Sequence, residues 1–522
     1  MHTLMIAASG AGKTACFTYP NIEYACACGM SFLVTDTKGD IYGNTATTAE
    51  KYYGYAIGII DLRNPIKSHG INMLNLVNHY TDLYLKDGNL THKAKAEKYA
   101  KITAKTIIYS TGQTDFGQNA YFYDTAESII TTTILLLAEF SPPNTSHIIS
   151  VYKLIQELIE PSKVIGVSNF KLFIDKLTPE HKARWFAGAA LNSNEPQLLN
   201  VFSTALSRLN GFIDSELEQI LCFDSCINTE SFCRGKTALY VVLPEEDNTK
   251  HFLVSLIIQQ MYREILLIAD ENGGKLNDCV MFYLEEIGTL PKIDNMEMIF
   301  SASRSRHVSI IANIQSFQQL RQKYGAEGAD IIIDNCQNTI TGGFAPNATS
   351  AKTISESLGK QTILSGSISR GNKNDSTSLQ MIAKPLMSIE ELKTMPKFRF
   401  IVMKTGKHPM KTDLKLFFKW GVTFEEQYEV KAQAERKIAY ASKKEIEEAI
   451  IKNSLEIQKR NQQAEQQQKK AEEPQNPPEP KEQEPNNKKE PNPSDRKDED
   501  FPLPGVKDDF KRQTRKGRDD RC

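Results

Sequence analysis

The sequence predicts an α/β fold with a central, mostly parallel β-sheet, a large inserted all-α domain and a disordered C-terminal tail. Three observations lead to this prediction. Short apolar runs rich in β-branched residues alternate with helical segments, and parallel strands with crossover helices are the expected result. The stretch 61–236 between two of these runs looks almost entirely helical, which is too long for a simple crossover. From residue 463 onward the composition is dominated by Gln, Glu, Lys, Pro and Asn.

The expected strands recur along the whole chain. They lie at 4–6, 31–35, 56–60, 237–243, 279–285, 308–314, 338–342 and 398–403. Such short, continuously apolar runs are typical of strands that are covered on both faces. Within the helical stretch, Thr125–Ala138 has apolar side chains around most of its circumference, as expected for the core helix of a domain.

A phosphate-binding loop is predicted directly after the first strand. There an apolar run leads into small residues that end in Gly-Lys-Thr before a predicted helix, the arrangement of a P-loop. Its glycines let backbone N–H groups turn toward an anion, and the helix N-terminus adds further donors. Ala7 stands where the first glycine of the pattern is expected. The residues expected to bind the nucleotide are Ser9, Gly10, Ala11, Gly12, Lys13 and Thr14.

Two of these side chains have specific expected roles. Lys13 is expected to bridge the β- and γ-phosphates, and the Thr14 hydroxyl is expected to ligate Mg²⁺. The cofactors predicted for this site are therefore ATP and Mg²⁺.

A pair of carboxylates follows the strand 279–285. Glu285 and Glu286 lie at its carboxyl end, which is where open α/β sheets bind their ligands. Adjacent residues of a strand point in opposite directions, so the two carboxylates cannot have the same task. We expect Glu285 to face the metal, usually through a water, and Glu286 to polarise the attacking water.

Two further residues flank the next predicted strand, 308–314. Gln315 follows the strand, where its amide is expected to read the γ-phosphate or hold the water. Arg304 precedes it, at the end of a predicted helix, where it is expected to reach a neighbouring subunit's nucleotide as an arginine finger. Considered alone, Arg304 would be interpreted as a surface charge.

Charge and composition exclude some classes of function. The chain has 63 Lys and Arg residues against 64 Asp and Glu residues, so its overall charge does not indicate a nucleic-acid binder. Any contact with DNA must come from a local patch or from the lumen of an oligomer. Lys98, Lys101 and Lys105 have helical spacing; we interpret them as a solvated helix face, with a basic binding face as the alternative.

Changes in composition divide the chain into five parts. They are the first part of a P-loop NTPase domain (1–62), an inserted all-α domain (63–235), the second part of the NTPase domain (236–425), a charged helix (426–462) and a disordered low-complexity tail (463–522).

The order of motifs resembles that of the TraG/TraD-type coupling proteins of conjugation and type IV secretion. The matching motifs are Gly10-Ala-Gly-Lys-Thr14, Pro20-Asn21, Val34-Thr-Asp-Thr-Lys-Gly-Asp40, Ser68 with Asn72-Met-Leu74, Phe122-Tyr-Asp-Thr-Ala-Glu127, Lys236-Thr-Ala-Leu-Tyr-Val-Val-Leu-Pro244, Leu284-Glu-Glu-Ile-Gly288, Arg304-Ser-Arg306, Gln315-Ser-Phe-Gln-Gln-Leu320, Asn335-Cys336 and Leu358-Gly-Lys360. They span most of residues 3–405.

The resemblance implies a RecA-like ATPase that assembles as a homohexamer. By similarity, Glu285 stands in the family's usual Asp position, Gln315 matches its sensor glutamine and Arg304 falls on its trans-acting arginine. The implied partners are single- or double-stranded DNA, a relaxase or other secretion substrate, and the proteins of the secretion channel. The inserted helical domain is the implied substrate-facing cap.

The resemblance also implies a location at the cytoplasmic side of the cell membrane. Most members have two transmembrane helices before the P-loop, whereas this sequence begins at the first strand, and its longest apolar run, Ile129–Ala138, is too short to cross a bilayer. The expected function is an ATP-hydrolysing coupling protein that brings DNA or a DNA–protein complex to the channel. The alternatives are an ATP-binding adapter that recruits substrates without DNA-driven turnover, and a DNA pump for segregation or packaging.

Overall fold

The computed structural model describes residues 1–471. The gaps in this description are 111–115, 163, 165, 225–226, 245–249, 291, 294, 371–374 and 432–435. Residues 1–454 form one compact unit, and the chain from residue 455 belongs to a second. The division of the first unit into an NTPase domain and an inserted domain stays a prediction.

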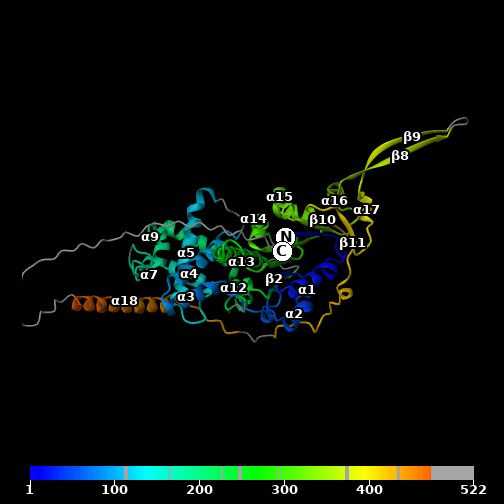
Figure 1. Cartoon of the computed structure of the whole chain (residues 1–522). Helices are drawn as coiled ribbons and strands as arrows, with labels where there is room; N and C mark the ends of the chain where they lie inside the picture. The colour runs from blue at the N-terminus through cyan, green and yellow to red at the C-terminus, as the bar shows by residue number, and fades with distance from the viewer. Residues whose placement is uncertain are drawn as a thin grey trace, which may run out of the picture. The chain divides into compact units, whose positions relative to one another are not determined.

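The centre of the first unit is a nine-stranded sheet with the order β11-β10-β7-β1-β6-β5-β2-β4-β3 (Figure 1). Its strands are β1 (Thr3–Ile6), β2 (Phe32–Asp36), β3 (Ala56–Asp61), β4 (Thr237–Val242), β5 (Val280–Leu284), β6 (Val308–Ile314), β7 (Asn338–Thr341), β10 (Arg399–Lys404) and β11 (Met410–Asp413). The first seven pair in parallel, and only β10 and β11 pair antiparallel. The predicted α/β fold with a mostly parallel sheet is therefore confirmed.

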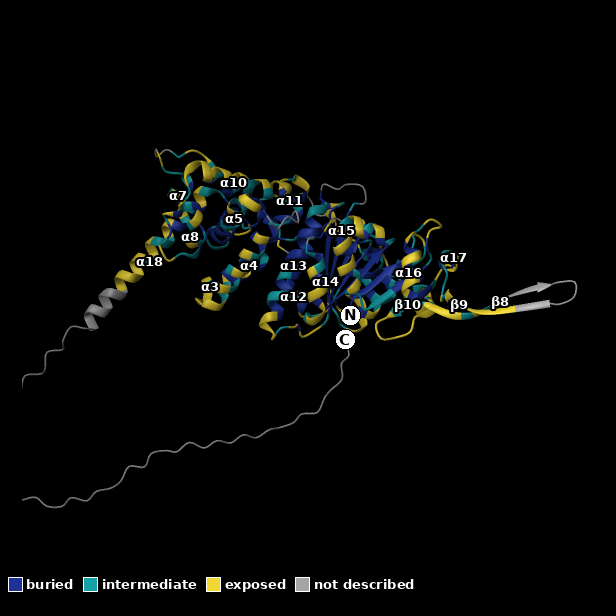
Figure 2. Cartoon of the chain, turned by 90° about the horizontal axis from the view of Figure 1, so that it is seen from above, coloured by how far each residue is buried: buried dark blue, intermediate teal, exposed yellow. Residues whose placement is uncertain are grey.

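Helices cover both faces of the sheet, which explains why its strands are continuously apolar. One face packs against α1 (Tyr19–Ala27) and α2 (Asp40–Tyr53). The other packs against α13 (His251–Glu271), α14 (Met296–Ser303) and α15 (Phe317–Asp334). Every residue of β6 is buried, and Figure 2 shows the sheet as the most deeply buried layer.

Between β3 and β4 the regular elements in the described residues are all helices. The α-helices are α3 (Asn75–Asp87), α4 (Leu90–Ile108), α5 (Ala120–Phe140), α6 (Ile148–Ile159), α7 (Asn169–Ile174), α8 (Lys182–Phe186), α9 (Gly188–Leu191), α10 (Glu195–Leu209), α11 (Ser215–Leu221) and α12 (Thr229–Cys233), and the 3₁₀-helices are η2 (Pro65–Lys67), η3 (Gly117–Asn119) and η4 (Asn210–Phe212). Helix α5 is the core helix that its composition predicts, because its apolar residues and its three consecutive threonines are buried. These helices share one hydrophobic cluster with α13, so the helical stretch packs directly against a helix that covers one face of the sheet.

Helix α13 is also long and apolar enough, by length and composition alone, to cross a membrane. However, 72% of its most apolar window is buried inside the fold. Its buried residues belong to the single hydrophobic cluster that contains both one face of the sheet and the helical stretch, and this position accounts for its apolar character. No other helix in the described ranges passes this test.

The structure contains a β-hairpin that the sequence did not predict. Strands β8 (Lys360–Arg370) and β9 (Asp375–Pro385) pair only with each other and extend from the rest of the unit (Figure 2). They lie between α16 (Ser350–Leu358) and α17 (Ile389–Lys393). Leu364 and Met381 are opposite each other in the ladder, and both are exposed. None of the hairpin residues whose burial is described, 360–366 and 378–385, is buried, and the segment lacks the continuous apolar run that marks the other strands.

The helix predicted over 426–462 is correct only for its second part, which lies in α18 (Lys443–Ala471). The described residues before α18 are not helical, because their backbone groups have partners on other helices. Tyr428 N–H donates to Gly43 O at 3.0 Å, and Ala441 N–H donates to Ser150 Oγ at 3.1 Å. These bonds replace the intrahelical ones.

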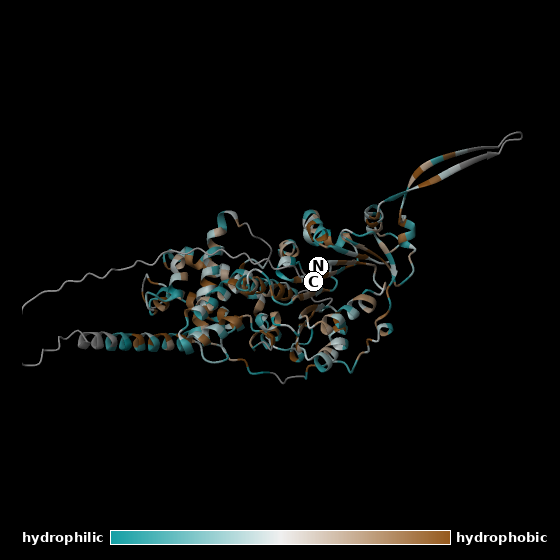
Figure 3. Ribbon diagram, viewed as in Figure 1, coloured by the Kyte–Doolittle hydropathy of each residue, from teal (hydrophilic) through white to brown (hydrophobic). Residues whose placement is uncertain are grey.

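At its other end, α18 extends to Ala471, nine residues into the predicted tail, and hydrophilic residues predominate along it (Figure 3). Gln, Glu, Lys and Ala are strong helix formers, which explains the extension. The remainder of the predicted disordered tail, 472–522, lies outside the described residues.

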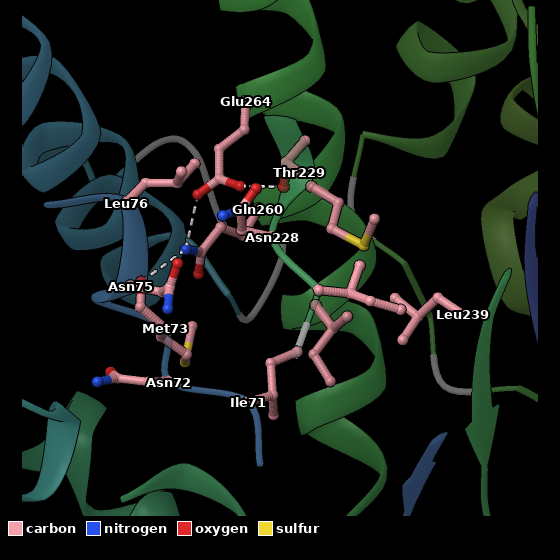
Figure 4. A pocket seen from close by; sticks show the side chains of 13 residues that line it. Ile71, Asn72, Met73, Asn75, Leu76, Asn228, Thr229, Leu239, Gln260 and Glu264 are labelled. Carbon is pink, nitrogen blue, oxygen red and sulfur yellow. Dashed lines mark hydrogen bonds between the residues drawn. The ribbon is translucent and has the colours of Figure 1, made fainter. Parts of the chain in front are cut away.

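A small cavity lies where α3, α12 and β4 meet α13, and it contains a buried carboxyl group (Figure 4). Glu264 is 5% exposed and accepts hydrogen bonds from Thr229 Oγ1 and from Gln260 Nε2, the latter at 2.9 Å. Gln260 Nε2 also donates to Met73 O at 2.9 Å. Burial raises the pKa of Glu264 to about 7, so this carboxyl titrates near neutral pH.

This titration makes the stability of the fold depend on pH. Between pH 4.5 and 7 the folded chain holds a proton on Glu264 that the unfolded chain releases, so the free energy of unfolding falls as pH rises and levels off above pH 7. We expect Glu264→Gln to remove this fall, which is at most about 3 kcal/mol. Melting temperatures between pH 5 and 8 measure it. The control is Glu356→Gln at an exposed position of α16, and equal pH slopes for both variants would contradict the prediction.

Candidate nucleotide-binding site

The predicted phosphate-binding loop leaves the carboxyl end of β1, a strand flanked by β6 and β7. Gly10 and Gly12 have φ angles of 76° and 91°, the left-handed conformation that glycine adopts without strain. Two backbone N–H groups of the loop donate to backbone carbonyls of the protein: Ala8 N–H donates to Gly343 O at 3.0 Å and Ala11 N–H donates to Ala8 O at 3.2 Å. The loop then enters a short π-helix, η1 (Thr14–Thr18), which continues into α1.

Alanine at position 7 fits because its surroundings are small. Ala7 is fully buried in a cluster with Met5, Ile340 and Phe400. A Cβ added at Gly342, which follows β7, would lie 2.9 Å from the Ala7 methyl group. The absence of a side chain at Gly342 therefore leaves the space that the Ala7 methyl group needs.

Lys13 lies under the loop with its ammonium group held by two partners. Its Nζ donates to Ala7 O at 2.9 Å and forms an ion pair with Glu286 Oε1 at 3.3 Å. The other carboxylate oxygen of Glu286 accepts a hydrogen bond from Gln315 Nε2 at 3.0 Å. The structure thus brings together three of the predicted residues, Lys13, Glu286 and Gln315, from β1's loop, the end of β5 and the end of β6.

The two adjacent carboxylates have different environments. Glu286 has φ 51° and is half-buried, whereas Glu285 is 5% exposed. Glu285 accepts a hydrogen bond from the Thr18 hydroxyl, and Asn313 Nδ2 donates to the same hydroxyl at 3.2 Å. Burial raises the pKa of the Glu285 carboxyl, and the hydrogen bond from Thr18 opposes this rise.

The two predicted metal ligands are not joined directly. No hydrogen bond links Thr14 to Glu285 in the described part of the chain, because the carboxylate reaches Thr18, one helical turn further along. Thr14 itself is half-buried at the first position of η1. Asn313 Oδ1 is a buried oxygen without a hydrogen-bond partner among the residues that the structure describes.

Arg304 lies at the amino ends of the parallel strands, whereas the loop lies at their carboxyl ends. It is exposed in the short 3₁₀-helix η5 (Arg304–Arg306), which precedes β6, whereas Gln315 follows β6. It is close to His2, whose pKa is lowered to about 4 by burial and then by the positive charges of the N-terminus and Arg304. Within one subunit, therefore, the structure does not bring Arg304 to Lys13.

Asp36 is a residue near the site to which the sequence assigned no role. It ends β2, the neighbour of β5, and its buried carboxylate accepts four backbone N–H groups, from Lys38, Gly39, Ile41 and Tyr42. Burial raises the pKa of Asp36, and the four hydrogen bonds oppose this rise. The carboxylate thereby fixes the turn that leads into α2. The signal was the Asp-x-Lys-Gly-Asp motif, in which the first aspartate shapes the loop.

Phe398 is a second residue that sequence reasoning missed. It precedes β10, has φ 68° and is 37% exposed. A Cβ added at Gly12 would lie 2.9 Å from its ring, so the ring covers the loop. Nothing in the sequence indicates this contact, because the two residues are far apart in the chain and meet only when β10 joins the sheet.

The comparisons with known proteins agree with this architecture. The sequence model of the family described as "Type IV secretory system Conjugative DNA transfer" matches residues 1–464. The type IV secretion system-coupling protein VirD4 of Bartonella quintana (strain Toulouse) is 20% identical over 430 residues, covering 80% of this chain and 63% of that protein. VirD4 of Bartonella henselae (strain ATCC 49882) is 21% identical over 275 residues, covering 51% of this chain and 42% of that protein. The chain thus spans less than two-thirds of the length of these curated relatives.

The solved structures of a bacterial conjugative coupling protein, TrwBdeltaN70, show the same fold at low sequence identity. The unbound monoclinic form has a TM-score of 0.53 and 14% identity, and the alignment covers 83% of this chain and 88% of that chain. TrwB in complex with the ATP analogue ADPNP has a TM-score of 0.52 and 14% identity, with coverage of 84% and 88%. Because the family model matches almost the whole of the described chain, the protein belongs to the type IV secretory system conjugative DNA transfer family of coupling proteins.

Proposed function

We propose that this chain is an ATP-hydrolysing coupling protein that recruits DNA, or a DNA–protein complex, and drives it into a type IV secretion channel. The observation that carries the proposal is the constellation of Lys13, Glu286 and Gln315 behind the phosphate-binding loop. A cation for the phosphates, a carboxylate for the water and an amide that holds this carboxylate are the groups that phosphoryl transfer to water needs. Membership of the family supports the coupling role.

Two observations support the proposal that ATP binds at this site. The space around Gly10 is open, since an added Cβ would meet no atom within 4 Å, whereas the buried Lys13 lies directly beneath the loop. TrwB, which has the same fold, has been solved with ADPNP and with ADP and Mg²⁺. In this proposal Ser9 to Thr14 surround the phosphates, and the ammonium group of Lys13 moves from Glu286 to the β- and γ-phosphates.

Oxygen atoms suited to Mg²⁺ surround the start of α1. Thr14 and Glu285 are the proposed ligands, and the unpartnered Asn313 Oδ1 beside Thr18 is a further buried oxygen in the same region. The ion would neutralise charge on the phosphates. Release of Lys13 leaves Glu286 as an unpaired carboxylate, held by Gln315 and ready to accept a proton from the attacking water.

Assembly would complete the site. Arg304 is exposed at the amino ends of the strands, whereas its own loop lies at their carboxyl ends. We therefore propose that Arg304 acts on the nucleotide of a neighbouring subunit in a homohexamer. The proposed partners are single- or double-stranded DNA, a relaxase or another secretion substrate, and the channel proteins at the cytoplasmic side of the cell membrane.

Steady-state ATP hydrolysis by the purified chain, with and without single-stranded and duplex DNA, tests the proposal. We expect DNA to accelerate turnover several-fold, because substrate in the lumen stabilises the assembled, hydrolysis-competent ring. The control is Lys13→Ala, which should hydrolyse no ATP under any condition. A chain that binds ATP and assembles but shows no acceleration by DNA would instead be an adapter, and the motor function would be wrong.

A further inference from the structure

Phe398 has a backbone conformation that aromatic residues rarely adopt. Its φ angle is 68°, in the left-handed region, where a bulky residue is strained. Such a conformation persists only where the surrounding structure enforces it, and strained residues of this kind cluster at functional sites. The question is therefore what the strained conformation of Phe398 achieves.

Burial in the core does not account for this strain. Phe398 is 37% exposed, and it belongs to none of the hydrophobic clusters that the described residues form. Its ring lies instead on the predicted phosphate-binding loop, where a Cβ added at Gly12 would lie 2.9 Å from one ring carbon and 3.0 Å from the next. Gly12 directly precedes Lys13, the residue expected to bind the phosphates. The strained conformation thus places an accessible aromatic ring against the loop.

The backbone of Phe398 is fixed to the structure beneath the loop. Leu414 N–H, directly after β11, donates to Phe398 O at 2.8 Å. Leu414 in turn packs against the buried cluster that contains Ala7, the residue at which the loop begins. Next to Phe398, the Arg399 guanidinium donates to both carboxylate oxygens of Asp413, at 2.7 Å and 3.2 Å, and this pair joins β10 to β11. The ring is therefore held in place relative to the loop.

We propose that Phe398 binds the base of the nucleotide, as the aromatic surface on which the purine ring stacks. This inference rests on the proposed binding of ATP at the loop. A nucleotide whose phosphates lie on Ser9 to Thr14 places its base outside the loop, and Phe398 provides an accessible ring beside it. Stacking uses the face of the base and none of its hydrogen-bonding groups, so Phe398 stabilises bound ATP and bound GTP alike.

Two ligands that differ in the presence of a base test the proposal on the full chain. They are a non-hydrolysable ATP analogue and inorganic tripolyphosphate, measured with Mg²⁺ by isothermal titration calorimetry. We expect Phe398→Gly to raise the Kd of the analogue by about 5- to 150-fold, the effect of losing one base–aromatic stack, and to leave the Kd of tripolyphosphate within about twofold. Glycine adopts a φ of 68° without strain, so the variant removes the ring and keeps the backbone conformation. An equal rise for both ligands, or no rise for the analogue, would overturn the proposal.

A matched pair of variants separates stacking on the base from mere covering of the loop. Phe398→Tyr keeps an aromatic ring and should leave the Kd of the ATP analogue within about twofold. Phe398→Leu keeps an apolar side chain that can cover Gly12 but cannot stack, and should raise this Kd at least about fivefold. The control Trp185→Ala removes an exposed aromatic ring from α8 and should leave the Kd unaltered. If Phe398→Leu binds the analogue as tightly as Phe398→Tyr does, the ring only covers the loop and the proposal is wrong.

Lys13→Ala distinguishes a failure of this inference from a failure of the proposed function. We expect this variant to abolish binding of the ATP analogue, because it removes the cation for the phosphates. Absent binding by the unmodified chain, or binding that does not depend on Lys13, would contradict the nucleotide site and with it the proposed function. Binding that depends on Lys13 and not on Phe398 would contradict only the stacking of the base.

Discussion

Glu286→Gln is expected to lower the turnover number for ATP by about 10² to 10⁴ while the chain still binds ATP. The glutamine is nearly isosteric and still has an oxygen that can accept the hydrogen bond from Gln315, but it cannot take a proton from the attacking water. The change also removes the anion that pairs with Lys13, so ATP faces less competition for this cation. Affinity for ATP should therefore be unchanged or higher. Steady-state hydrolysis and equilibrium binding of an ATP analogue measure the two effects separately.

The matched control is Glu356→Gln, the same chemical change at an exposed position of α16, which should leave both parameters unaltered. Two outcomes would contradict the assigned role. If Glu286→Gln retained most of the turnover, the catalytic carboxylate would be elsewhere. If it lost ATP binding, the pair with Lys13 would be needed to shape the loop, and the effect on hydrolysis would be indirect.

Much of the fold could be predicted because parallel strands that are covered on both faces are continuously apolar in the sequence. The run 308–314 is apolar throughout, and in the structure all of β6 is buried between two layers of helices. The helical stretch could be predicted for the same reason. Apolar residues occupy most of the circumference of α5, and this pattern indicates a helix that is enclosed by other helices. In both cases a local pattern reports burial, and burial on both sides leaves few alternatives for the topology.

The rest depends on contacts between distant segments, which no local pattern reports. None of the residues of the hairpin β8–β9 whose burial is described is buried. Before α18, described residues of the non-helical segment have hydrogen-bond partners on α2 and α6. The cover that Phe398 forms over Gly12 arises only when β10 adds antiparallel to the edge of the parallel sheet. Such contacts join residues that are far apart in the chain, and a single sequence does not indicate which distant residues meet.

The candidate site shows the same division between its parts. The loop is local, so its glycines and Lys13 could be identified from spacing alone, and the approach of Gln315 to Glu286 follows from the parallel pairing of β5 with β6. The hydrogen bond of Glu285 to Thr18, by contrast, depends on where η1 places each hydroxyl, because a π-helix rotates successive side chains differently from an α-helix. Spacing indicates which residues are near a site, and the helix geometry decides which atom is presented.

A mixture of two inactive variants is expected to recover activity that neither has alone. Arg304→Ala should lower turnover by about 10³-fold or more if the guanidinium stabilises charge on a neighbour's nucleotide, and Lys13→Ala should be inactive because its own loop cannot hold the phosphates. Arg304 cannot reach the loop of its own chain, because the full length of β6 separates it from Gln315 at the carboxyl end of that strand. In a mixed ring, a loop with intact Lys13 can adjoin a subunit with intact Arg304.

With head-to-tail interfaces and equal amounts of the two variants, about a quarter of the interfaces contain both intact residues, so turnover should approach a quarter of the unmodified rate if the interfaces act independently. Steady-state hydrolysis after mixing under conditions of subunit exchange measures this. The matched control mixes Lys13→Ala with the double variant Lys13→Ala and Arg304→Ala, which cannot form a complete interface and should stay inactive. If the first mixture also stays inactive while subunits demonstrably exchange, Arg304 does not act between subunits. Full activity of Arg304→Ala by itself would show that the guanidinium has no part in hydrolysis, and its exposure at the edge of the sheet would then be that of an ordinary surface charge.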